Sequence, residues 1–239
     1  MTAAAVFDLD NTLVRGSCLF HFGRWLVRTR MVSPWDVLRF ASVEASYVRR
    51  RAEPAGMIPT VVDRALALVE GRAQADLRAE AGRFATRMLA RRLDRDVHLQ
   101  VGDFREAGYV TLLATASPQE LADAVARELG MDGAIGTRAE VRDGRYTGRL
   151  TEPICHGAAK ARRVRLHLDE RGLDVQACWA FSDSVNDLPL LALVGHPVAT
   201  NPDPELAAIA RVNDWRVLSS RQGDEVSWAR LNALFPFPF

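Results

Sequence analysis

Short apolar runs alternate with amphipathic helical patterns along most of the chain. The runs that are typical of buried strands lie at residues 3–7, 109–114, 134–135, 177–181, 197–199 and 215–218. Segments with apolar residues three and four positions apart lie between them, at residues 96–107, 118–129, 158–171, 188–194 and 204–210. Strands that alternate with helices predict an α/β fold, in which a parallel sheet carries helices on both faces.

A long helical pattern interrupts this alternation directly after the first apolar run. It extends from about residue 17 to residue 93, with apolar stripes that begin at Phe20, Val37 and Val61. Because strands resume only after it, we interpret residues 15–94 as an α-helical cap domain inserted into a core domain made of residues 1–14 and 95–239. A second local signal, Asp143-Gly144 between alternating residues, predicts a β-hairpin.

Composition and overall charge are those of an ordinary folded protein. The chain has 239 residues, 48% of them hydrophobic, and a formal net charge of +1, so its charge indicates no nucleic-acid or membrane partner. Cys18, Cys155 and Cys178 lack the spacing of metal or redox motifs. No apolar segment has the length of a signal peptide or a membrane span. We therefore expect buried thiols and a cytoplasmic protein.

Lysine is nearly absent from the sequence, because Lys160 is the single lysine among 31 basic residues. A chain that uses arginine wherever either cation suffices retains a lysine where a compact ammonium group is needed. The alternative is that Lys160 lies on the surface by chance.

Polar side chains follow the predicted strands at the ends where a parallel sheet gathers its functional residues. They are Asp8 and Asp10 after the first strand, Thr115 after the second, Asp183 and Asp187 after the strand at 177–181, and Lys160 near the start of the preceding helix. Clustered carboxylates repel one another unless a divalent cation neutralises them. A ligand set made of oxygen atoms alone favours Mg²⁺.

The same motifs, in the same order, resemble the four motifs of the haloacid dehalogenase-like (HAD) phosphatase superfamily. They read FDLDNT, LLATAS, Lys160 and FSDSVNDLPLL. The helical insertion and the run DGRYTG before CHGAAK are similar to the branch that includes phosphoserine phosphatase. The resemblance covers nearly the whole chain and implies a Rossmann-like core with an inserted cap, a Mg²⁺-dependent phosphatase and a small phosphorylated metabolite as substrate.

The resemblance also implies a role for each motif residue. Asp8 is the expected nucleophile that forms an aspartyl-phosphate, and Asp10 the acid that protonates the leaving alcohol and then deprotonates water. Thr115 and the backbone at Ala116 and Ser117 are expected to bind the phosphoryl group, and Lys160 to neutralise its charge.

The expected metal ligands are Asp8, the backbone carbonyl of Asp10, and Asp183, with Asp187 orienting the site from close by. Asp10 separates the chain from relatives that cleave carbon–halogen bonds, which lack this second acid. Relatives that cleave phosphonates carry a lysine in the cap, and residues 15–94 contain none. A phosphate monoesterase remains.

The substrate is left open by the sequence. Phosphoserine phosphatases carry a glutamate nine residues after the nucleophile, where this chain has Ser17, and a cap arginine that corresponds to Arg64. Phosphoserine, amino-alcohol, polyol and histidinol phosphates all stay possible. An arginine-rich stretch of the predicted cap is either a solvated face or a means of steering anionic substrates.

Two other functions and two structural questions also stay open. The chain could be a phosphotransferase or mutase of the same superfamily, or a phosphate-ligand binding protein without catalysis. The C-terminal run that ends FPFPF could dock on the core or on a second subunit. The sequence does not indicate an oligomeric state.

Overall fold

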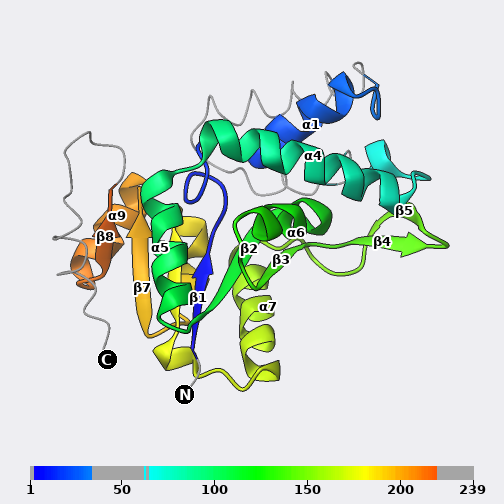
Figure 1. Cartoon of the computed structure of the whole chain (residues 1–239). Helices are drawn as coiled ribbons and strands as arrows, with labels where there is room; N and C mark the ends of the chain where they lie inside the picture. Colours follow the sequence, from blue (N-terminus) through cyan, green and yellow to red (C-terminus); the bar gives the residue numbers. More distant parts are fainter. Residues whose placement is uncertain (1–2, 34–61, 63–64, 220–239) are drawn as a thin grey trace.

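A six-stranded parallel sheet forms the centre of the computed structural model, which describes residues 3–33, 62 and 65–219. The strand order is β3-β2-β1-β6-β7-β8. Figure 1 shows the sheet with helices on both sides, so the predicted α/β, Rossmann-like fold is confirmed. The strands are β1 (Ala4–Phe7), β2 (Val110–Pro118), β3 (Gly133–Thr137), β6 (Trp179–Ser182), β7 (His196–Thr200) and β8 (Arg216–Leu218).

Two hydrophobic clusters lie on the two faces of this sheet, because successive residues of a strand point to opposite sides. Phe7 of β1 belongs to one cluster with Phe104 of α5, and Val6 belongs to the other with Val164 of α7. The core helices are α5 (Arg95–Glu106), α6 (Gln119–Glu128), α7 (Gly157–Glu170), α8 (Leu188–Leu191) and α9 (Pro204–Val212), with short 3₁₀ turns η1 (Val175–Ala177) and η2 (Val185–Asp187).

The observed end of one strand differs from the predicted one at a place that matters for the site. Strand β2 continues past Ala114 to Pro118, because its last residue pairs with Thr137 of β3 after a register shift. The hydroxyl of Thr137 also donates to the carbonyl of Ala116 at 2.7 Å. Thr115 therefore lies inside an extended strand rather than after its end.

The insertion contributes α1 (Cys18–Arg28), helical residues at 65–69 and α4 (Gln74–Arg92), which Figure 1 shows above the end of β1. The chain enters and leaves this region at neighbouring points. The amide of Arg15 donates to the carbonyl of Arg92 at 3.0 Å, and the amide of Asp94 donates to the carbonyl of Leu13 at 2.8 Å.

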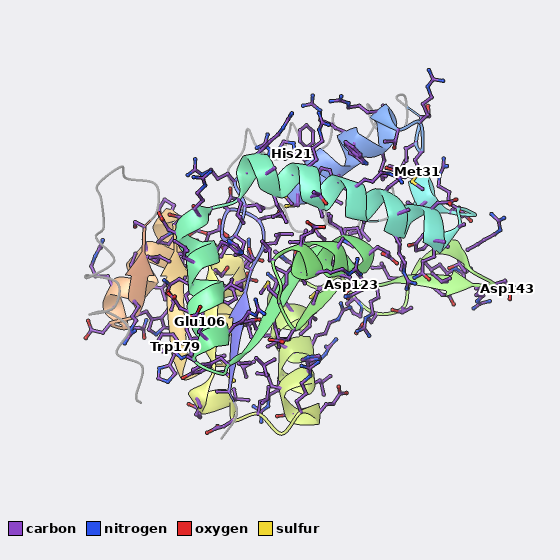
Figure 2. The ribbon with its side chains drawn as sticks, in the orientation of Figure 1. His21, Met31, Glu106, Asp123, Asp143 and Trp179 are labelled. Carbon is purple, nitrogen blue, oxygen red and sulfur yellow. The ribbon has the colours of Figure 1, made fainter. Side chains whose placement is uncertain are left out.

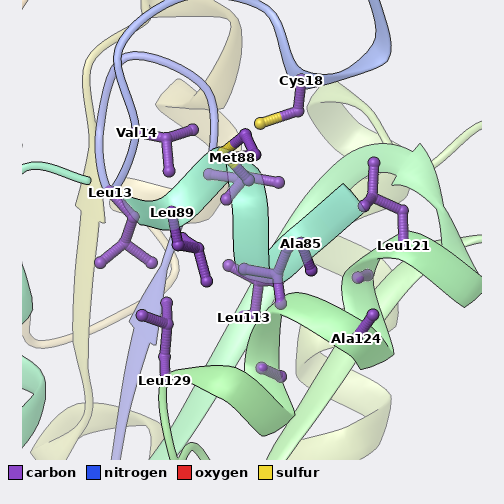
Figure 3. Close-up of a cluster of buried hydrophobic side chains, with 14 of the residues drawn as sticks. Leu13, Val14, Cys18, Ala85, Met88, Leu89, Leu113, Leu121, Ala124 and Leu129 are labelled. Atoms are coloured by element: carbon purple, nitrogen blue, oxygen red, sulfur yellow. The ribbon is translucent and has the colours of Figure 1, made fainter. Parts of the chain in front are cut away.

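The long helix α4 shares one hydrophobic core with the sheet domain. Figure 3 shows Ala85, Met88 and Leu89 of α4 beside Leu121 of α6 and Leu113 of β2, and all of them are buried in the same cluster. This part of the insertion is therefore packed against the core rather than standing apart from it.

The predicted hairpin forms from β4 (Ala139–Arg142) and β5 (Arg145–Leu150), and its turn residues Asp143 and Gly144 have φ values of 49° and 75°. Positive φ at both central residues is the geometry that an Asp-Gly turn favours. The hairpin also binds the insertion. The amide of Gly71 donates to the carbonyl of Tyr146 at 2.9 Å, and the amide of Gln74 donates to that of Gly144 at 2.9 Å.

All three cysteines lie in the described part of the chain, where they are buried and free of disulfides, as predicted. Over the same described residues, none of the helices has the length and apolarity that crossing a bilayer requires.

Candidate active site

Three of the predicted residues meet at the carboxyl ends of the strands. Asp8 directly follows β1, and its amide donates to the carbonyl of Phe181 in β6 at 2.9 Å. Lys160, in the first turn of α7, places its Nζ 2.7 Å from Oδ1 of Asp8 and 2.7 Å from Oδ2 of Asp187. The single lysine is thus a buried cation that bridges two carboxylates from different elements.

The charge of Lys160 is held by these two partners. Burial alone lowers the pKa of a lysine, but the negative charges of Asp8 and Asp187 raise the pKa of Lys160 above its ordinary value. Burial raises the pKa of Asp8, Lys160 opposes that rise, and the carboxylates of Asp187, Asp183 and Asp10 add to it. Four carboxyl groups and one ammonium group therefore influence one another at this site.

Asp10 is held by the start of the insertion. Its Oδ1 accepts a hydrogen bond of 2.7 Å from the amide of Cys18, the first residue of α1. Burial raises the pKa of Asp10, and the bond from Cys18 opposes that rise. Ser17, a predicted substrate residue, is the N-cap of α1, and its hydroxyl accepts from the amide of Phe20 at 3.3 Å.

The second motif presents two buried hydroxyl groups on the extended end of β2. The amide of Ser117 donates to Oγ1 of Thr115 at 3.1 Å. The Ser117 hydroxyl is buried and has no hydrogen-bond partner among the described residues. Ala116 uses its carbonyl to accept from Thr137. Among the described residues, no hydrogen bond joins this motif to Lys160. Its place near the site follows from strand order, because β2 lies next to β1.

The acidic loop after β6 is fixed by two residues to which the sequence motifs gave no role. Ser182 donates to Oδ2 of Asp187 at 2.7 Å, on the same oxygen that Lys160 contacts. Asp203 donates its amide to the carbonyl of Asp183 at 2.7 Å and accepts from the amide of Val185 at 2.8 Å. Ser182 belongs to the quoted motif and could have been assigned, whereas the Asp203-Pro204 pair signals only a helix start.

The acidic oxygen atoms around Lys160 are the candidate ligands for a divalent cation. Burial raises the pKa of Asp183 to about 7, and the charges of Asp187 and Asp10 contribute to this rise. Oδ1 of Asp187 is buried and accepts no hydrogen bond from the described residues. Those residues contain no group of three His, Cys, Asp or Glu side chains arranged around one point. The expected ligand set has only two carboxylates, those of Asp8 and Asp183, because Asp10 is expected to bind the metal through its backbone carbonyl.

Arg64, the other predicted substrate residue, is outside the described residues. An open hollow lined by Trp179, His196, Trp215 and Arg216 lies at the opposite, amino ends of β6, β7 and β8 and contains none of the predicted site residues.

Comparison with known proteins places most of the chain in one family. The family model described as haloacid dehalogenase-like hydrolase matches residues 5–192. The chain is 41% identical to a phosphoserine phosphatase of Mycobacterium tuberculosis over 221 residues, which are 92% of this chain and 72% of that protein. It is 29% identical to a histidinol-phosphatase of Neisseria meningitidis over 223 residues, which cover 92% of this chain and 99% of that protein.

A solved structure from Bordetella pertussis, of a protein with unknown function, has the same fold. It superposes with a TM-score of 0.80 at 30% sequence identity and covers 92% of this chain and 100% of that chain.

Proposed function

Because the chain belongs to the haloacid dehalogenase-like hydrolase family, we propose that it is a Mg²⁺-dependent phosphatase that hydrolyses small phosphomonoesters through an aspartyl-phosphate. The observation that carries the proposal is the double contact of Lys160, 2.7 Å from Asp8 and 2.7 Å from Asp187. It leaves the second oxygen of Asp8 outside this contact, available as a nucleophile beside a fixed positive charge. The relatives named phosphoserine phosphatase and histidinol-phosphatase support the same chemistry.

In the first step a carboxylate oxygen of Asp8 attacks phosphorus, and the bond between phosphorus and the alcohol oxygen breaks. Asp10 gives its proton to that oxygen, so the alcohol leaves neutral. Burial favours the protonated form of Asp10 that this step needs. The Cys18 amide holds the side chain in place by its hydrogen bond to Oδ1.

In the second step water attacks the phosphorus of the aspartyl-phosphate. Asp10, now ionised, takes a proton from the water, the acyl–phosphate bond breaks, and Asp8 is released with inorganic phosphate. Through both steps Lys160, Thr115 and the amides at Ala116 and Ser117 are assigned to the phosphoryl oxygens, where fixed positive groups lower the barrier most. The Ser117 amide would exchange its hydrogen bond to Oγ1 of Thr115 for one to the phosphoryl group.

We assign the Mg²⁺ ligands to Asp8, the backbone carbonyl of Asp10, and Asp183. Asp187, which accepts hydrogen bonds from Ser182 and Lys160, is assigned to orient the site from close by. A bound Mg²⁺ supplies charge neutralisation of the phosphoryl oxygens and orients them. Burial raises the pKa values of Asp8 and Asp183, and the neighbouring carboxylates add to both rises, which supports this assignment.

We assign residues 15–94 to the cap and residues 1–14 and 95–239 to the core. The adjacency of Arg15 and Arg92, and of Leu13 and Asp94, supports these boundaries. The substrate is a small phosphorylated metabolite, with Ser17 and Arg64 on the cap as candidate contacts. Because the Ser17 hydroxyl is a helix cap and carries no charge, it offers no counter-charge to an amino group.

The test is phosphate release from p-nitrophenyl phosphate in the presence of Mg²⁺. We expect Asp8→Asn to lose activity by at least about 1,000-fold, because the amide is not a nucleophile. Asp96→Asn, an exposed carboxylate on α5, is the matched control and should keep full activity. Equal activity of Asp8→Asn and the wild type would overturn the proposal. Transfer of phosphate to added alcohols in preference to water would instead indicate a phosphotransferase.

A further inference from the structure

Asp203 lies in the loop between β7 and α9 and contacts the acidic loop directly after Asp183. Building on the proposed function, we propose that Asp203 is a positioning residue for Mg²⁺, which sets the affinity for the cation by holding the backbone of Asp183. In this role Asp203 acts through Asp183 and is not itself a ligand. Asp183 belongs to the last of the sequence motifs, whereas Asp203 lies beyond it in the chain.

Three hydrogen bonds join Asp203 to two neighbouring segments. Its amide donates to the carbonyl of Asp183 at 2.7 Å, and its Oδ2 accepts from the amide of Val185 at 2.8 Å. Its Oδ1 accepts from the amide of Leu206 at 2.7 Å, as the N-cap of α9. Both carboxylate oxygens are therefore engaged, one by the acidic loop and one by the first turn of the helix.

The backbone around Asp203 is fixed by contacts outside the acidic loop. Pro202 precedes it and Pro204 follows it. A proline restricts the residue before it to extended backbone, and Asp203 has a φ of −62° and a ψ of 163°. Asn201 donates its amide to the carbonyl of Leu218 in β8 at 2.7 Å, which ties the start of this loop to the neighbouring strand. Asp203 is therefore a firm support for the segment that it contacts.

Asp183 lies between two anchored points of the chain. The residue before it, Ser182, is paired with Ala199 of β7 at the end of the sheet. The turn after it is held by the bonds from Asp203 at the Asp183 carbonyl and the Val185 amide. The backbone at Asp183 is thus fixed on both sides against β7 and the loop that follows β7. Residues that orient a metal ligand in this way typically change the metal affinity by about 10–100-fold when they are replaced.

The other carboxylate of the acidic loop is held in a different way. Asp187 accepts through Oδ2 from the hydroxyl of Ser182 and from Nζ of Lys160, both at 2.7 Å. Neither of these bonds involves Asp203. Loss of the Asp203 side chain should therefore loosen Asp183 and leave the contacts of Lys160 in place. The affinity for Mg²⁺ should fall, while the chemical step is largely kept.

The alternative role for Asp203 is that of a helix cap alone, because an aspartate before a proline is a common start of a helix. Substitutions separate the two roles. Asp203→Ser keeps one oxygen that can cap α9 but cannot also accept from Val185. Asp203→Asn keeps the size and one acceptor oxygen of the carboxylate, so it should retain part of the effect. Asp203→Ala removes both side-chain bonds.

The experiment titrates metal-free protein with Mg²⁺ alone and follows Tm by differential scanning fluorimetry. We expect Asp203→Ser and Asp203→Ala to need about tenfold more Mg²⁺ than the wild type for half of the rise in Tm, with Asp203→Asn between them. The Mg²⁺ concentration that gives half of the maximal hydrolysis of p-nitrophenyl phosphate should rise by the same factor. The kcat at saturating Mg²⁺ should fall by less than about threefold, because the contacts of Lys160 are kept.

The matched control is Asp174→Ser, at a second aspartate that caps a short helical turn. Oδ1 of Asp174 accepts from the amide of Gln176 at 3.0 Å at the start of η1, which precedes β6. Figure 2 shows Trp179, the first residue of β6, at the amino end of the sheet, whereas the acidic loop follows the carboxyl end of that strand. Asp174→Ser should therefore leave the Mg²⁺ concentration at half of the Tm rise unchanged.

The same half-point for the wild type and Asp203→Ser would overturn the inference and leave Asp203 as a helix cap. A half-point raised equally by Asp174→Ser would overturn it too, as would a wild-type Tm that does not respond to Mg²⁺. The Mg²⁺ titration contains no substrate, so its result is separate from the proposed activity. Failure of the proposed function would appear differently, as no phosphate release by the wild type from p-nitrophenyl phosphate.

Discussion

Helix α7 carries two buried cations three residues apart, and they contact different kinds of group. Lys160 faces the acidic edge of the sheet, where its ammonium group bridges Asp8 and Asp187. Arg163 faces the loop before the helix, where its guanidinium donates to the carbonyls of Gly136 and Pro153. It also pairs with Glu152 at 2.9 Å.

The difference shows what each cation is suited to. The planar fork of Arg163 satisfies backbone carbonyls that point at it from two segments, which fixes the loop between the hairpin and α7. The compact ammonium of Lys160 fits between two carboxylates 2.7 Å away on either side. Arg163 therefore holds backbone carbonyls, whereas Lys160 contacts the carboxylates to which the proposed chemistry assigns roles, although both cations are buried on the same helix.

The largest expected effect comes from giving Lys160 the side chain of its neighbouring cation. Lys160→Arg keeps the positive charge but places a bulky fork where a point charge contacts both Asp8 and Asp187. We expect the variant to fold and to lose at least about 100-fold in kcat, the loss typical of one misplaced group in a charge-stabilising site. Circular dichroism and turnover of p-nitrophenyl phosphate measure the two properties. Turnover near that of the wild type would make the lone lysine a coincidence of composition.

The reciprocal change, Arg163→Lys, should have a smaller effect, on stability rather than on turnover. Arg163→Lys cannot reach both carbonyls and Glu152 at once, so a buried carbonyl loses its donor. We expect a loss of about 1–3 kcal/mol in the free energy of unfolding, measured by urea denaturation, with kcat changed by less than about twofold. A large fall in kcat at unchanged stability would contradict the structural role.

The smallest effect tests whether the edge faced by Lys160 holds a cation. The folded-state pKa of Asp183 is raised to about 7, above its unfolded value of about 3.9. The folded state thus binds this proton more tightly, and metal-free protein should lose stability as pH rises from about 4 to about 7. Mg²⁺ favours the ionised carboxyl and should raise Tm by about 3–6 °C more at pH 8 than at pH 5.

Differential scanning fluorimetry in Mg²⁺ and in EDTA measures this shift. Asp183→Asn is the control variant and should show little difference between the two pH values. A Mg²⁺-dependent rise in Tm that is equal at both pH values would argue against a site made of these carboxylates.

Most of the architecture followed from local patterns. The alternation of strands and helices predicted the parallel sheet, and the four ordered motifs predicted the family that the comparisons confirm. Strand ends were predicted less well. The extension of β2 to Pro118 depends on pairing with Thr137, about twenty residues away, and no local pattern contains that partner.

Only part of the site was predicted, because some of its contacts, like the end of β2, depend on partners far apart in the sequence. Parallel strands bring their carboxyl ends together, so residues following β1 and β6 were expected to meet, and Asp8, Lys160 and Asp187 do. Contacts that cross elements without a motif were missed. Asp203 fixes the loop of Asp183, and the Cys18 amide holds Asp10, through backbone groups whose partners are set only by the folded chain.

The sequence by itself determined the class of fold, the family and the identity of the acidic and cationic groups, because periodicity and motif order are properties of neighbouring residues. Only the tertiary structure decided which cation contacts which carboxylate or carbonyl group. It gave Lys160 two carboxylates, left Arg92 with a backbone carbonyl, and joined α4 to the core. Hydrogen bonds and burial depend on distances between segments far apart in the chain, and folding alone sets those distances.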